Sequence, residues 1–266
     1  MSVFKSNLKL NVKKVVQYRA SAISGIFTQL FFGFMYIALY TSFLKSGNSD
    51  FTQREMISYV WLGQIFFVAF NYFDICKQEI SRRIMNGDYA YELIRPINLY
   101  DNWFQIVYSK PLGHLLVRGL PVIIISLLLP CGLGLMLPPS IECLLLFIVS
   151  TIISSLLIAS ISMISYVITL YTLSSAGVFA FMVAIGNLLS GGVVPIPMMP
   201  KAVQTVLNFF PFRYVSDLPY RLYMGNINGT EALIQIAVQI AWTAGLIVVG
   251  KLIMNRKLKK LVVQGG

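Results

Sequence analysis

Three basic side chains stand at four-residue spacing inside an apolar stretch of this sequence. They are Lys110, His114 and Arg118, and the spacing places them on one face of a helix. Such a face could contact a lipid headgroup or an anionic substrate. The alternative is that Lys110 and His114 extend to the membrane surface at the end of a span, which leaves Arg118, about a turn deeper, as the best functional candidate.

Metal and acid–base chemistry find little support in the sequence. His114 is its only histidine, so an HExxH zinc centre cannot form. Asp74 suits the boundary of an apolar run better than catalysis, and the carboxylates inside such runs are too few for a paired acid–base site. Cys76, Cys131 and Cys143 form no CxxC pair. The last two could pair across an outer loop, although buried free thiols fit better.

One string resembles a nucleotide-binding loop. Residues 245–252 fit GxxxxGK, but Leu252 replaces the Ser or Thr that binds magnesium. The string also lies inside an apolar run, where a phosphate-binding loop after a strand cannot form. We therefore expect no ATP site and no cofactor in this chain.

The elements that position these residues are predicted to be membrane helices. Of the 266 residues, 57% are hydrophobic and 12% are charged, roughly half the charged share of a soluble domain. We predict an all-α membrane protein in which one domain, residues 1–266, has six transmembrane helices of about 20 residues each. The spans are predicted between Arg19 and Lys45, between Glu55 and Asp74, near 105–129, near 144–170, near 176–189, and between Glu231 and Lys251.

The distribution of charge predicts the orientation of the spans. The net charge is +11, but the basic residues form no stripe interleaved with aromatics, so nucleic acid is not an expected partner. They gather in residues 1–19, after the second span and at the C-terminal end, which predicts that both termini and that loop are cytoplasmic. Residues 1–19 alternate lysines with apolar residues, which indicates an amphipathic interfacial helix or, alternatively, a plain charged flank.

The cytoplasmic segment 77–101 is too patterned for a simple connector. Asp88 can cap a short helix and Pro96 can end it. That helix would present Tyr91, Leu93 and Ile94 to a partner protein. The alternative is a surface turn without a partner.

The extracytoplasmic segment 190–228 carries five prolines and apolar pieces too short to span a membrane. We predict a re-entrant helix pair, the first helix over 202–210 and the second from Ser216. Arg213, Asp217 and Arg221 would share one face that meets water or headgroups. The side chains expected to pack inward as an extracytoplasmic lid are Val206, Leu207, Phe210 and Phe212. An ordinary outer loop is the alternative.

Aromatic residues gather in the first two spans, and small residues pattern the others. We expect spans one, two and five to face an internal pathway or a second membrane chain, because aromatic rings suit an amphipathic ligand. Lipid contact is the equal alternative for any single residue. The pathway or interface candidates are Phe32, Tyr36, Tyr40, Phe67, Phe70 and Asn71. The small residues expected to allow close helix packing are Gly25 and Gly33, Ser150 and Ser154, Ser155 and Ala159, and Ala176, Ala180 and Ala184.

This pattern resembles the permease subunits of ABC-2 type ABC transporters over nearly the whole chain. A string similar to a "G-(hydrophobic)-L-x-R-P" stretch of a bacterial subgroup runs from Gly87 to Ile97. Residues 190–195, Met199-Pro200 and 210–212 resemble the outer segment of that subgroup.

The resemblance implies a division of labour. Two permease chains, identical or homologous, would form an export pathway in the bacterial plasma membrane. Two separate ATPase subunits, which bind ATP and Mg, would drive it. The ATPase contact would then be formed by Asp88, Tyr89, Tyr91, Glu92, Leu93 and Arg95. A secondary transporter or channel-like protein without an ATPase partner is the alternative function, and a membrane enzyme or assembly scaffold is less favoured.

Overall fold

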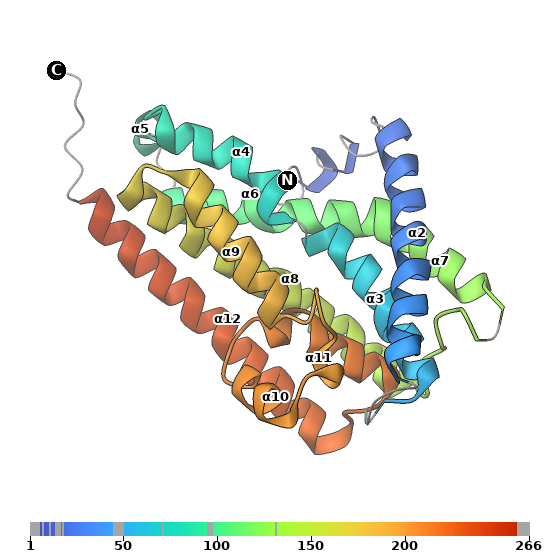
Figure 1. The fold of residues 1–266 in the computed structure, drawn as a ribbon. Helices are drawn as coiled ribbons and strands as arrows, with labels where there is room; N and C mark the ends of the chain where they lie inside the picture. The colour runs from blue at the N-terminus through green and yellow to red at the C-terminus, as the bar shows by residue number, and fades with distance from the viewer. Residues whose placement is uncertain are drawn as a thin grey trace.

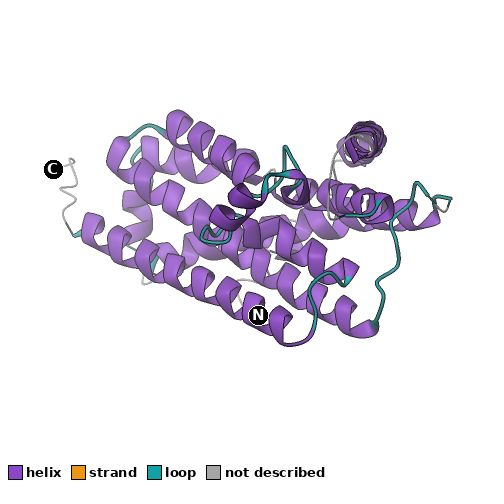
Figure 2. Ribbon diagram, turned by 60° about the horizontal axis from the view of Figure 1, so that its bottom comes forward, coloured by secondary structure: helices purple, strands orange, loops and turns teal. Residues whose placement is uncertain are grey.

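The computed structural model shows a helical protein, and its described part contains no strand (Figure 2). The structure describes residues 6, 8–10, 12, 13, 17, 19–44, 51–70, 72–94, 98–130 and 132–259, without the side chains of residues 19–22, 68–70, 72–78, 110, 111 and 114. The predicted interfacial helix over residues 1–19 falls mostly outside this set and stays a prediction.

The first two long helices, α2 (Arg19–Leu44) and α3 (Gln53–Phe70), pack closely against each other. Gly33 permits the approach, because a Cβ at that position would lie 2.6 Å from Cζ3 of Trp61. Trp61 itself is completely buried. The expected role of a small residue in packing these spans is therefore confirmed at Gly33.

The segment predicted to be cytoplasmic contains α4 (Tyr72–Met85) and the short α5 (Tyr89–Leu93). The third apolar stretch follows as α6 (Leu99–His114), the π-helix η1 (Leu115–Gly119) and α7 (Leu120–Leu128). Pro121 explains why η1 is a π-helix, which has a wider turn than an α-helix. Proline has no N–H to donate to the carbonyl of Val117, four residues earlier in η1.

The predicted division of the long uncharged stretch at residues 172–175 is confirmed. Helix α8 (Ile141–Thr172) begins where Ser140 Oγ accepts a hydrogen bond from Cys143 N at 3.2 Å. It ends at Leu173, whose φ of 50° is left-handed, and α9 (Ser175–Leu189) follows. Cys143 is a buried free thiol, whereas Cys131 lies outside the described residues.

The predicted outer segment forms two short helices, but their bounds differ from the prediction. After the 3-10 helix η2 (Ile196–Met198), α10 (Lys201–Leu207) ends three residues earlier than expected. Helix α11 (Arg213–Met224) begins three residues earlier than expected and continues through Pro219. The last helix, α12 (Gly229–Leu258), packs along α8.

The buried apolar residues form two clusters that share α11. One cluster joins α6, α8, α9 and α12, to which α11 contributes Tyr214 and Leu218. The other joins α2, α3 and α7, to which α11 contributes Tyr220 and Tyr223. In Figure 1, α4, α5 and the end of α12 lie at one end of the molecule, and α10 and α11 lie toward the other.

Three helical stretches among the described residues are long and apolar enough to cross a membrane: Ile23–Leu44, Ile141–Thr172 and Gly229–Leu258. Two shorter apolar stretches, Leu115–Leu128 and Ser175–Leu189, accompany them. The chain is therefore a multi-pass membrane protein.

Candidate functional site

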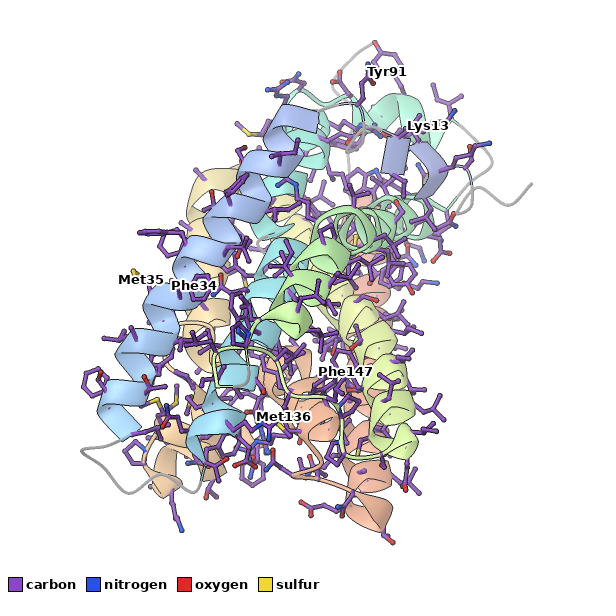
Figure 3. All side chains as sticks on the ribbon, turned by 90° about the vertical axis from the view of Figure 1, so that its right-hand side faces the viewer. Lys13, Phe34, Met35, Tyr91, Met136 and Phe147 are labelled. Carbon is purple, nitrogen blue, oxygen red and sulfur yellow. The ribbon has the colours of Figure 1, made fainter. Side chains whose placement is uncertain are left out.

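The short helix α5 presents apolar side chains to the outside at the end of the molecule. Tyr91 is 74% exposed and Ile94 is 82% exposed, and Figure 3 shows Tyr91 projecting from that end. Leu93 is also exposed. A five-residue helix is not stable by itself in water, so its neighbours must hold it in place.

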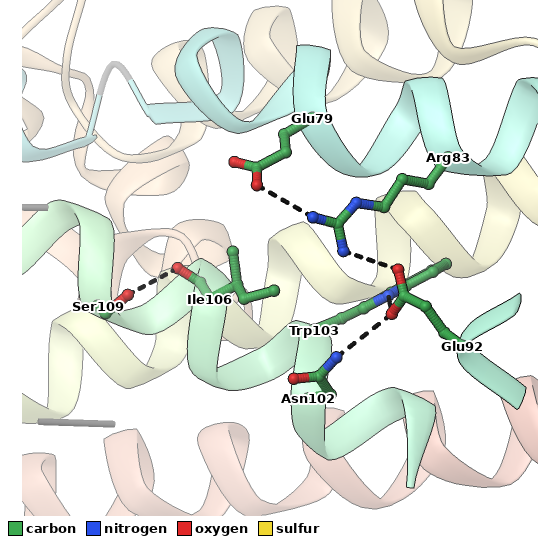
Figure 4. A network of polar contacts seen from close by, with 7 residues as sticks. All are labelled: Glu79, Arg83, Glu92, Asn102, Trp103, Ile106 and Ser109. Atoms are coloured by element: carbon green, nitrogen blue, oxygen red, sulfur yellow. Dashed lines mark hydrogen bonds and ion pairs between the residues drawn. The ribbon is translucent and has the colours of Figure 1, made fainter. Parts of the chain in front are cut away.

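Glu92 attaches α5 to the rest of the protein (Figure 4). Its Oε1 pairs with Arg83 Nη1 of α4 at 2.7 Å. Its Oε2 accepts hydrogen bonds from Trp103 Nε1 at 2.9 Å and from Asn102 Nδ2 at 3.3 Å, both on α6. We call Glu92, Arg83, Asn102 and Trp103 the Glu92 network. It uses both carboxylate oxygens inside the chain, so the Glu92 side chain positions the short helix.

The expected start of the short helix is correct, but its expected cap is not. Asp88 precedes α5 with helical dihedral angles, φ −61° and ψ −19°, and its side chain makes no capping hydrogen bond. An N-cap residue normally has extended dihedral angles, which explains the missing bond. Asp88 is exposed and Tyr89 is partly buried, whereas Arg95 and Pro96 lie outside the described residues.

At the opposite end, Asp217 of α11 pairs with both arginines that the sequence placed beside it. Its Oδ2 lies 3.0 Å from Arg213 Nε and 2.9 Å from Arg221 Nε. Tyr59 of α3 donates a hydrogen bond to Oδ1 at 3.1 Å. These four residues form the Asp217 cluster. Burial alone would lower the pKa of the Arg221 guanidinium, but the Asp217 carboxylate beside it holds that pKa above its ordinary value.

The prediction that this charged face meets water or headgroups is wrong. Asp217 is completely buried and Arg213 is 7% exposed. The four-residue spacing identified a shared face, but the covering surface comes from α3 and α8, which pack on α11.

The four predicted lid residues divide into two pairs. Leu207 is 2% exposed and Phe212 packs against the core cluster of α8 and α12. Val206 and Phe210, however, are 56% and 41% exposed. The inward packing expected of the whole set therefore holds only for Leu207 and Phe212.

Four of the six predicted pathway residues line one cavity of about 230 Å³. Phe32, Tyr36 and Tyr40 come from α2 and Phe67 comes from α3. The Tyr36 and Tyr40 rings stack with their centroids 5.6 Å apart. We call this space the α2–α3 cavity. The Phe70 side chain and Asn71 lie outside the described residues.

Polar side chains that the sequence analysis overlooked complete the α2–α3 cavity. Gln29, Gln64 and Asn187 line it, together with Tyr59 of the Asp217 cluster. The sequence could have pointed to these residues, because each is an uncharged amide inside an apolar span. In such a span every polar group needs a hydrogen-bond partner. The residues 190–192, after α9, close the same space.

A comparison with known families decides what kind of protein carries this arrangement. The sequence matches the description "ABC-2 family transporter protein" over residues 25–265. The chain belongs to this family. It is a permease component of an ABC transporter, a membrane subunit distinct from the ATPase. No curated protein matches the chain.

Gln239 of the ABC-2 permease connects three helices inside the bundle, and the sequence analysis missed it. Its Nε2 donates to Tyr214 O of α11 at 2.7 Å and to Ser154 Oγ of α8 at 2.9 Å. Its Oε1 accepts from Ser150 Oγ at 3.0 Å. Ser150 and Ser154 were expected to allow close packing, and both are fully buried here. Gln239 satisfies the polar groups at this contact between α8, α11 and α12.

The basic face in the third apolar stretch is described only at Arg118. This residue lies in η1, and a Cβ added to Gly25 of α2 would be 3.3 Å from Arg118 Nη1. Gly25 thus provides the space for a guanidinium between α2 and η1. The side chains of Lys110 and His114 are not described, so the proposed headgroup contact stays a prediction.

Proposed function

We propose that this permease forms the translocation pathway of an ATP-driven exporter, as a dimer with an identical or homologous chain. Two separate ATPase subunits, which bind ATP and Mg, supply the energy. The six spans are α2, α3, the continuous segment α6–η1–α7, α8, α9 and α12. The location is the bacterial plasma membrane, with both termini and α5 in the cytoplasm.

The observation that carries the proposal is the construction of α5. An exposed apolar surface, formed by Tyr91, Leu93 and Ile94, stands on a helix that Glu92 fixes from inside. Large exposed apolar groups outside the spans are typical of a contact with another protein. The rigid attachment would let movement of an ATPase pass through α4 and α6 into the membrane helices.

Co-purification with the ATPase tests this contact. Leu93→Arg and Ile94→Arg should insert normally, since both side chains are exposed, but should lose the ATPase subunit and stop ATP-dependent transport. Leu173→Arg is the matched control, because Leu173 is 64% exposed in the turn after α8. Undiminished ATPase binding by both α5 variants, or equal loss in the control, would contradict the assignment.

For the dimer, α9 offers a face of small residues. Ala176, Ala180 and Ala184 are all exposed in the single chain, whereas the small residues of α8 are already covered. Ala180→Cys should crosslink two permease chains in native membranes. Ala159→Cys, at a fully buried position, should not crosslink, and a monomeric Ala180→Cys chain would argue against this face.

We also propose that residues 190–223 form an extracytoplasmic lid over the pathway. Cysteine labelling from the outer side distinguishes a packed lid from a loose loop. Val206→Cys should react readily, because Val206 is exposed, and Leu207→Cys should stay protected in the resting state. Equal labelling at both positions would indicate a loop without fixed packing.

A further inference from the structure

We infer that the α2–α3 cavity binds an uncharged amphipathic molecule that carries a hydrogen-bond donor. The inference rests on the proposed transport function and adds the chemical class of the ligand. It is drawn from three features of the cavity: its charge, one unpartnered acceptor and its apolar rim.

The described lining of the cavity contains no charged side chain. The Asp217 carboxylate, which accepts a hydrogen bond from the cavity-lining Tyr59, is already paired with Arg213 and Arg221. A charged ligand would therefore lose its hydration without gaining a partner of opposite charge, which is costly in an apolar environment. The cavity selects uncharged groups.

Gln29 supplies the second feature. Its side chain lines the cavity and the residue is 8% exposed. Its Oε1 is buried and has no hydrogen-bond partner among the residues that the structure describes. A buried acceptor without a partner destabilises a protein, because the lost hydration is not replaced. Rotation of the Gln29 amide would turn this oxygen toward the cavity, where a hydroxyl or amide N–H on the ligand would satisfy it.

The apolar part of the ligand has a place at the rim. Phe32 is 38% exposed and Phe67 is 46% exposed, and both line the cavity. Because both residues lie within helices that we assign as spans, a ligand reaches the cavity from the bilayer. The volume of about 230 Å³ is below the roughly 300–1,000 Å³ of drug-sized sites. The cavity therefore suits a polar headgroup while an apolar chain remains in the bilayer.

Substitutions at two positions separate binding in the cavity from partition into lipid. Gln29→Leu removes the acceptor with little change in size. Gln235→Leu is its matched control, because Gln235 on α12 also has a buried Oε1 without a partner in the described part of the chain but does not line the cavity. Gly63→Leu fills the cavity, since a Cβ at Gly63 would meet nothing within 4 Å. Gly245→Leu, at an equally open position on α12, is the second control.

The experiment measures binding of radiolabelled monododecanoyl glycerol to the full chain in lipid nanodiscs. Dodecanoate and dodecyltrimethylammonium serve as charged probes with the same chain length. We expect saturable binding of the uncharged probe and binding of both charged probes that is weaker by about tenfold or more.

Gln29→Leu should weaken binding about three- to tenfold and Gly63→Leu should abolish it, while both controls bind as the unchanged chain does. Equal binding of a charged probe, or unchanged binding by Gln29→Leu and Gly63→Leu, would overturn the inference. Because no ATPase is present, either result leaves the proposed α5 contact untouched.

Discussion

The Glu92 network and the Asp217 cluster lie at opposite ends of the molecule, and each holds a carboxylate, partly buried at Glu92 and completely buried at Asp217. The two carboxylates have different roles. Glu92 has partners on two other helices, Arg83 on α4 and Trp103 on α6. Asp217 finds both of its arginines on its own helix, and only Tyr59 comes from elsewhere. The first carboxylate attaches a five-residue helix to its surroundings, whereas the second compensates charge within α11. Glu92 therefore determines the position of α5, whereas Asp217 makes it possible to bury α11.

The largest effect is expected when the charge balance of α11 is removed. Asp217→Asn leaves the buried Arg213 and the partly buried Arg221 beside a neutral amide, and breaking a buried pair typically destabilises a protein by about 3–5 kcal/mol. Thermal unfolding of the purified permease in detergent would measure the loss. The triple change Arg213→Met, Asp217→Leu and Arg221→Met should recover much of it, because no charge is left unpaired. A triple variant as unstable as Asp217→Asn would show that packing, and not charge, dominates at this cluster.

Substitution of Glu92 is expected to cost less stability than Asp217→Asn. It should have a larger effect on the coupling of ATP hydrolysis to transport. Glu92→Gln removes the ion pair to Arg83 and weakens the bond from Trp103, which should reduce the free energy of unfolding by about 1–3 kcal/mol. Since α5 would then be poorly positioned, transport should fall more than ATP hydrolysis does in the assembled complex. Glu79→Gln is the control, because the Glu79 side chain pairs with the same Arg83 but is 41% exposed, and such pairs contribute only about 0–1 kcal/mol. Equal effects of the two changes would refute the positioning role of Glu92.

The hydrogen bond that Tyr59 of α3 donates to Asp217 should contribute less. Tyr59→Phe removes one hydrogen bond to Asp217 and keeps the ring that packs against Tyr220, so we expect a loss of about 1 kcal/mol. The same unfolding measurement applies. Tyr171→Phe, at an exposed position, should have no measurable effect. A loss at Tyr59 as large as that of Asp217→Asn would mean that the arginines on α11 do not suffice to balance the carboxylate.

The smallest effect concerns Glu55, at the start of α3 on the side of α11. Partial burial alone would raise the pKa of the Glu55 carboxyl, but hydrogen bonds from Thr52 and Asn226 outweigh it and lower that pKa. A carboxyl whose pKa is lowered by folding stabilises the protein above its unfolded pKa, and that contribution is lost as the pH falls through the folded value. Unfolding followed from neutral to acidic pH should therefore show a small loss of stability that Glu55→Gln abolishes. An unaltered pH dependence in that variant would assign the titration to another group.

The sequence predicted local structure better than it predicted which surfaces are covered. The division at residues 172–175 was predictable, because the uncharged stretch was too long for one helix, and the spacing of Arg213, Asp217 and Arg221 correctly predicted that they share one face. Burial of that face was not predictable, since it depends on α3 and α8, which are distant in the sequence. The Glu92 network was missed for the same reason: Arg83 and Trp103 lie on α4 and α6, so no spacing within one helix relates them to Glu92. The position of Pro219 was no guide to the end of α11, because the helix continues through it.

The membership of α11 in both apolar clusters also has a consequence for biosynthesis. The cluster around α2 and α3 is incomplete without Tyr220 and Tyr223, which the ribosome adds more than 150 residues after Tyr59. During synthesis the first two helices can enter the bilayer and pair through Gly33. Their aromatic and hydroxyl groups have no packing partners, however, until α11 has been synthesised. A chain truncated between α9 and α11 should therefore remain sensitive to membrane proteases, even though it contains five of the proposed spans.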